Sequence, residues 1–110
     1  MSHAWISGNT INVTNSAAAP AYGICVGTDG YTASATLGPC YVVGNTIRYS
    51  GSYGGHALLV GTGADASCVI GNTVIVDSTV TNFLGAAIGI VCKSKGVSIL
   101  NNNISGARGI

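Results

Sequence analysis

Charge is the property that this sequence lacks most. Only four basic and three acidic residues occur among 110, or 6% of the chain, where an ordinary soluble domain has roughly 25%. With a net charge of +1 and no basic stripe, the chain is not expected to bind nucleic acid, which requires many cations to neutralise phosphates. No apolar run approaches the length of a membrane span. The opening Met1-Ser2-His3 leads straight into patterned sequence, so we expect no signal peptide.

The sequence also lacks an apolar stripe at helical spacing. Its 17 glycines, and its many Ser, Thr, Asn and β-branched residues, are poor helix formers. Together these features exclude an ordinary helical bundle. A chain of 110 residues is long enough for one domain with one modest core.

Two short motifs alternate along the chain. The first, Gly-Asn-Thr-Ile, stands at Gly8–Ile11, Gly44–Ile47, Gly71–Val74 and, in degenerate form, Asn101–Ile104. The second stands at Gly23–Val26, Ala57–Val60, Gly89–Cys92 and Gly109–Ile110. Their uneven spacing is typical of a solenoid, in which the strands are fixed and the loops vary in length.

Aligning the copies gives columns of similar apolar residues. The column before the first motif is Ile6, Val42, Val69 and Ile99, and the column within it is Ile11, Ile47, Val74 and Ile104. The second motif contributes Ile24, Leu58, Ile90 and Ile110. Residues two apart on a strand share a face, so these columns predict parallel, in-register strands around one core. We expect three short strands per repeat and almost complete burial of the first column.

A column of asparagines lies between the first two apolar columns, at Asn9, Asn45, Asn72 and Asn102. Asparagine tolerates the left-handed backbone of a sharp bend, and its amide can bond the amides above and below it. The column predicts a structural Asn ladder at a tight bend between the first two strands.

These motifs resemble the right-handed parallel β-helix of pectate-lyase-like proteins and phage tailspikes. The resemblance covers essentially the whole chain and implies an all-β, single-stranded parallel β-helix of three to four coils. Residues 1–110 then form a single segment of about three and a half coils, with insertions near 14–21, 28–39 and 77–86. No amphipathic helix covers either end, so we expect a segment without caps, excised from a longer solenoid. A complete small protein with its edges masked by oligomerisation is the alternative.

The four cysteines are predicted to be reduced. Cys40 and Cys92 fall on inward columns and Cys25 and Cys68 on outward ones. Cys40 and Cys68, one coil apart, and Cys25 and Cys92, two coils apart, therefore face opposite sides, and neither pair meets disulfide geometry. Their spacing fits no zinc pattern. Reduced cysteines suit folding in a reducing cytosol.

Two outward columns are apolar: Val43, Ile70 and Leu100 form one ladder, and Cys25, Leu59 and Val91 form another. Monomers seldom expose such contiguous patches. Either the chain's own long loops cover the ladders or sister chains do. The resemblance to tailspikes implies the second arrangement, a homotrimer.

Few residues are available for acid–base chemistry. Asp29 and Asp65 follow the third strand of successive repeats, and two such carboxylates are what a glycosidase needs. Lys93 and Lys95 occupy the same turn one repeat later and would neutralise an acidic sugar. The alternative interpretation is that all four are ordinary solvated turn residues.

Aromatic residues near loops are candidates for sugar contact. Tyr31, Tyr49 and Tyr53 have Ser and Gly around them, and aromatic faces stack on sugar rings. His56, at a glycine-flanked corner, is either a base or a structural residue. No Asp cluster like the calcium site of pectate lyases is present, so no metal or cofactor is expected.

The resulting hypothesis is a β-helical segment of a phage tailspike or tail fibre that binds, and in one version degrades, a surface polysaccharide. The alternatives are a fragment of a secreted polysaccharide lyase or hydrolase, and a purely structural, adhesin-like solenoid. The expected location is the virion or the extracellular space. No nucleic-acid or membrane partner is expected.

Overall fold

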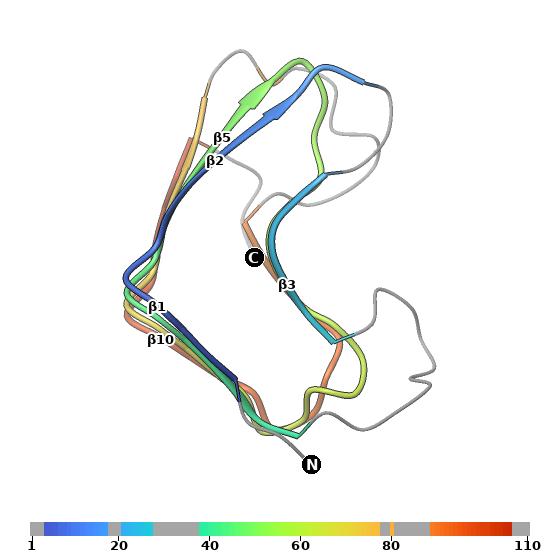
Figure 1. Ribbon diagram of the computed structural model, residues 1–110, viewed down its shortest axis with the longest axis vertical. Coiled ribbons are helices and arrows are strands. Elements are labelled where there is room, and N and C mark those ends of the chain that lie inside the picture. The colour runs from blue at the N-terminus through green and yellow to red at the C-terminus, as the bar shows by residue number, and fades with distance from the viewer. Residues whose placement is uncertain (1–3, 18–20, 28–37, 78–79, 81–88, 107–110) are drawn as a thin grey trace.

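The computed structural model describes residues 4–17, 21–27, 38–77, 80 and 89–106 (Figure 1). Every regular element in these ranges is a β-strand. The described ranges therefore contain no helix of the length and hydropathy that crossing a membrane would need.

The strands form three sheets. The first has the order β1 (Ala4–Ser7), β4 (Cys40–Val43), β7 (Cys68–Ile70) and β10 (Ser98–Leu100). The second has the order β2 (Thr10–Asn15), β5 (Thr46–Gly51), β8 (Thr73–Val76) and β11 (Asn103–Ser105). The third has the order β3 (Tyr22–Val26), β6 (His56–Val60) and β9 (Ile90–Cys92).

All the strand pairs are parallel, and the chain visits the three sheets in the same order each time. In Figure 1 the strands of each sheet lie one behind another, with β1 and β10 stacked along one side and β2 and β5 along another. The chain is therefore all-β with parallel sheets, an arrangement compatible with a parallel β-helix.

The strand register agrees with the columns in the sequence. Ile6 pairs with Val42, Val42 with Val69, and Val69 with Ile99. Val42 and Val69 are fully buried, but Ile6 and Ile99 are only half-buried, so the expectation of burial along the whole column is wrong at its two ends. The reason is geometric, since β1 and β10 are the outer strands of their sheet and each has a neighbour on one side only.

The bend between the first and second sheets depends on the residue that precedes the ladder Asn. The φ angles are 67° at Gly8, 66° at Gly44, 65° at Gly71 and 55° at Asn101. The sequence predicted the left-handed conformation at the ladder Asn, and this prediction is wrong. The residue with positive φ is the one that precedes the ladder Asn. Glycine is favoured there because it has no Cβ, and Asn101 fills the position in the last copy because Asn tolerates this region.

All four cysteines are free, as predicted. Cys40 is buried, Cys68 is half-buried and Cys25 is exposed. Cys92 was expected to face inward but is exposed. Its strand, β9, is the last described strand of the third sheet, so nothing in the described part of the chain pairs with it on that side.

The first predicted insertion begins later than expected. Strand β2 continues to Asn15, because Thr14 pairs with Ser50 and Asn15 with Gly51 in β5. The other two predicted insertions lie mostly outside the described residues.

Candidate functional site

The predicted acidic pair is represented in the structure by Asp65 alone, because Asp29 lies outside the described residues. Asp65 is exposed, and its Oδ1 accepts a hydrogen bond from the backbone N–H of Lys95 at 2.9 Å. The backbone N–H of Ala66 donates to the Lys95 carbonyl at 2.8 Å. Asp65 thus links two turns that stack on each other, which is the role of a structural turn residue.

The two predicted lysines lie on the second of these turns. Lys93 is half-buried, and its backbone N–H donates to the Val60 carbonyl at 2.7 Å. Lys95 is exposed and uses its backbone for the turn contacts. Lys95 is therefore placed as a turn residue beside Asp65.

The predicted aromatic platform is not assembled as expected. Tyr31 lies outside the described residues, and Tyr53 is half-buried. Tyr49 is fully buried, with its hydroxyl 3.4 Å from the Ala21 carbonyl and 3.4 Å from Asn15 Nδ2. A buried ring cannot stack on a sugar, so Tyr49 is a core residue and its assignment as a sugar contact is wrong.

His56 lies on the third sheet, in register with Tyr22 on β3. The two rings are 5.6 Å apart and tilted by 43°. His56 is half-buried and Tyr22 is exposed. This ring contact is compatible with the structural interpretation of His56.

The asparagine column forms a hydrogen-bonded ladder in the structure. Asn9, Asn45 and Asn72 each donate from their backbone N–H and from Nδ2 to Oδ1 of the next Asn, at 2.9–3.0 Å. Asn45 and Asn72 are only 1% exposed. These two side chains are therefore structural and are not available to a ligand.

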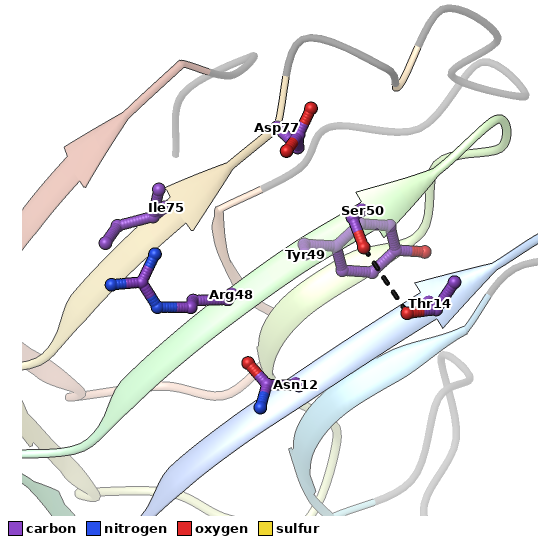
Figure 2. Close-up of a pocket in the computed structure, with 7 residues that line it drawn as sticks. All are labelled: Asn12, Thr14, Arg48, Tyr49, Ser50, Ile75 and Asp77. Carbon is purple, nitrogen blue, oxygen red and sulfur yellow. Dashed lines mark hydrogen bonds between the residues drawn. The ribbon is translucent and has the colours of Figure 1, made fainter.

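A pocket lies on the outer face of the second sheet (Figure 2). Its volume is about 290 Å³. The residues that line it come from β2, β5 and β8 and from the position directly after β8: Asn12, Thr14, Arg48, Tyr49, Ser50, Ile75 and Asp77. Tyr49 lies behind the sheet, so the exposed lining consists of the other six residues.

Strand register places these six side chains in two short rows across the sheet. Asn12 pairs with Arg48, and Arg48 with Ile75, which makes the first row. Thr14 pairs with Ser50, and the backbone N–H of Asp77 donates to the Tyr49 carbonyl at 2.8 Å, which brings Asp77 beside Ser50 in the second. The half-buried Val13 and the buried Tyr49 and Val76 alternate with these residues along the three strands and anchor them from the core side.

The pocket combines a cation, a carboxylate and two hydroxyls. Arg48 is exposed, and among the described residues none forms a hydrogen bond or ion pair with its guanidinium. The hydroxyls of Thr14 and Ser50 are 3.3 Å apart, and Asp77 is exposed at the end of β8. Neighbouring strands are about 4.8 Å apart and alternate residues on a strand about 7 Å apart, so the polar groups are spaced on the scale of one sugar ring.

Sequence reasoning did not assign this pocket. Its members alternate with core residues, so their outward direction follows from the pattern, but the insertions between repeats conceal which outward residues become neighbours. Arg48 is the residue that could have indicated the pocket from the sequence, because it is the only charged residue within the described strands of the second sheet.

Comparison with known proteins adds no assignment. No protein-family model, curated protein or solved structure matches the chain. In the described ranges, no group of three or more His, Cys, Asp or Glu side chains is placed to hold a metal ion.

Proposed function

We propose that the chain is a segment of a right-handed parallel β-helix, of the type found in pectate-lyase-like proteins and phage tailspikes, and that it binds a surface polysaccharide. Three observations support the architecture. The sheets are parallel, the chain visits them in a constant order, and the apolar and Asn columns stack in register.

The observation that carries the binding proposal is the pocket on the second sheet. The backbone that carries its polar side chains belongs to a hydrogen-bonded sheet, so little backbone freedom is lost when a ligand binds. The Arg48 guanidinium donates up to five hydrogen bonds, the Thr14 and Ser50 hydroxyls donate or accept, and the Asp77 carboxylate accepts. This set matches the hydroxyl groups of a saccharide, which also both donate and accept.

Binding is favoured over cleavage at this pocket. Asp77 is the only acidic residue among those that line it. Glycosidases of both stereochemical classes use two carboxyl groups. A site with one carboxylate and one guanidinium is suited to hold a sugar unit and not to hydrolyse it.

The test is a screen of the chain against a panel of immobilised bacterial surface oligosaccharides, neutral and acidic, followed by NMR titration of the hits. We expect chemical-shift changes at the amides of Arg48, Ser50 and Asp77. Arg48→Gln should weaken binding about tenfold or more, because hydrogen bonds from a charged donor contribute about 1.5–3 kcal/mol.

Lys95→Gln is the matched control, since Lys95 is an exposed cation outside the pocket. It should bind like the unchanged chain. The proposal fails if no saccharide in the panel shifts the pocket amides, or if Arg48→Gln and Lys95→Gln weaken binding equally.

We also propose that the outer face of the first sheet packs against sister chains in a homotrimer. Trp5 is 69% exposed and stacks on Tyr41 with ring centroids 4.6 Å apart, and Leu100 is 53% exposed. Val43 and Ile70 lie between them and are half-buried. Together these residues form an apolar face that association would remove from water.

The second apolar ladder, formed by Cys25, Leu59 and Val91, does not require a sister chain to bury its central residue. Leu59 is fully buried within the single chain, although it points away from the core cluster. The expectation that sister chains cover this residue is therefore wrong, and the chain itself covers it.

A further inference from the structure

The pocket on the second sheet holds two opposite charges that do not pair with each other. Arg48 forms no hydrogen bond or ion pair with any described residue, although Asp77 lines the same pocket, and both side chains are exposed. From this separation of charge we infer that the pocket takes a saccharide unit bearing both a carboxylate and a protonated amine, with the carboxylate on Arg48 and the amine on Asp77. This assignment rests on the saccharide binding proposed above and names the class of sugar.

Strand register keeps the two charges apart. Arg48 on β5 pairs with Ile75 on β8, and Asp77 lies two residues beyond Ile75, where its backbone N–H donates to the Tyr49 carbonyl at 2.8 Å. The charged residues are therefore offset by one strand and by one row, or about 4.8 Å across the sheet and about 7 Å along the strands. Figure 2 shows Ile75 beside Arg48 and Asp77 farther along the strands.

The row that contains Arg48 supplies hydrogen-bond donors. The guanidinium is planar and presents its N–H groups in a fork that matches a carboxylate. Asn12 is the register partner of Arg48 on β2 and is exposed, so its side-chain amide can donate to the same anion. Ile75, on the other side of Arg48, has no polar group and offers the guanidinium no competing acceptor. This row is therefore suited to a carboxylate.

The row that contains Asp77 supplies hydrogen-bond acceptors. The Ser50 hydroxyl donates to the Val13 carbonyl at 3.4 Å, so the bond between the Ser50 and Thr14 hydroxyls, 3.3 Å apart, is donated by Thr14. Both hydroxyl hydrogens are thus engaged within the sheet. The remaining lone pairs of the two hydroxyls and the Asp77 carboxylate all accept. An ammonium group, which only donates, is the complement of this row.

The charges of the pocket cancel, which favours a sugar with both charges over a sugar with one. Arg48 and Asp77 are the only charged residues in the lining, and both lie within about 8–10 Å of any bound unit, the distance over which salt screens a charge. A sugar with only a carboxylate is attracted by Arg48 and repelled by Asp77, and a sugar with only an amine meets the reverse. An aminouronic sugar carries its carboxylate and its amine at opposite ends of the ring, as the two rows require.

The test is an NMR titration with glucosaminuronic acid, which carries both charges, and with glucuronic acid, glucosamine and glucose, at a pH where the sugar amine is protonated. Glucosaminuronic acid should shift the amides of Arg48 and Asp77 and bind about threefold or more tighter than each of the other sugars, the scale expected for an exposed charge pair. Arg48→Gln should remove the advantage that the carboxylate gives. Asp77→Asn should remove the advantage that the amine gives.

Asp65→Asn and Lys95→Gln are the matched controls, because both residues are exposed and lie outside the pocket. They should keep the order of the four sugars, and far-UV circular dichroism should show the same strand content in all variants. The inference is overturned, while saccharide binding stands, if glucose shifts the pocket amides and glucosaminuronic acid binds no tighter than glucose. It is also overturned if the amine advantage survives in Asp77→Asn or the carboxylate advantage survives in Arg48→Gln. If no saccharide shifts the pocket amides, the proposed function fails as well.

Discussion

At the scale of single residues, the buried asparagines should contribute strongly to stability. Asn72 Oδ1 accepts hydrogen bonds from the backbone N–H and Nδ2 of Asn45, and its own Nδ2 donates to the Val42 carbonyl at 2.9 Å. Asn72→Ala leaves the Asn45 N–H and the Val42 carbonyl buried without partners, which should cost roughly 2–5 kcal/mol. Urea unfolding followed by circular dichroism measures this loss.

Asn9→Ala serves as the comparison, because Asn9 is exposed and lies at the end of the ladder. Its loss should cost less than about 1 kcal/mol, since Asn45 Oδ1 still accepts from the Asn9 backbone N–H. If Asn72→Ala and Asn9→Ala lower the free energy of unfolding equally at matched protein concentration, the ladder is not a buried network.

Residue positions were predictable where they follow from alternation along a strand. The columns through Val42 and Val69 are correct for that reason, because the face of a residue is a local property of the sequence. Tyr49 was misassigned because its nearness to a loop was given more weight than its alternation with Arg48 and Ser50. Burial at the ends of columns, as at Ile6, depends on what lies beyond the outer strands and is not a local property.

At the scale of elements, the bend between the first two sheets should accept Asn and reject β-branched residues. Gly71 has a φ of 65°, and a Cβ built there has no atom within 4 Å, so backbone strain alone decides the outcome. Gly71→Asn should change the free energy of unfolding by less than about 1 kcal/mol, because Asn tolerates the left-handed region. Asn101 already occupies the equivalent position with a φ of 55°.

Gly71→Val at the same bend should cost roughly 1–3 kcal/mol, since a β-branched residue is strained in this region. Thermal unfolding of the two variants side by side separates strain from packing. A Gly71→Asn variant as unstable as Gly71→Val would mean that a steric contact, and not φ, restricts this position.

The pocket shows where element-level prediction from sequence ends. The outward direction of Asn12, Arg48 and Ile75 follows from alternation, but their meeting in one row requires the register across three strands separated by segments of unequal length. The repeated Gly-Asn-Thr motif supplies that register, so the row was recoverable in principle. The second row was harder to predict, because Asp77 lies just beyond the end of β8.

At the scale of the whole molecule, the three sheets present surfaces of different character. The second sheet carries the polar pocket, and the first carries the exposed Trp5 and Leu100. Ligand binding and lateral association therefore use separate surfaces, and each can be removed without the other.

Ile70→Lys tests lateral association through the first sheet. Ile70 lies on β7 between Val43 and Leu100 in the outward ladder, so a lysine there would place a charge in the centre of the proposed trimer interface. Burying an unpaired ammonium costs several kcal/mol, which three symmetric copies of the contact multiply. We expect the trimer to dissociate to monomers.

Ile75→Lys is the matched control for this experiment, because Ile75 is also an outward, half-buried isoleucine but lies on β8 in the second sheet. A lysine there changes the pocket and leaves the apolar face of the first sheet intact, so Ile75→Lys should remain trimeric. Light scattering gives the mass of each species directly. An unchanged chain that is monomeric at high concentration, or an Ile70→Lys variant that stays trimeric, would show that Trp5, Ile70 and Leu100 do not form a lateral interface.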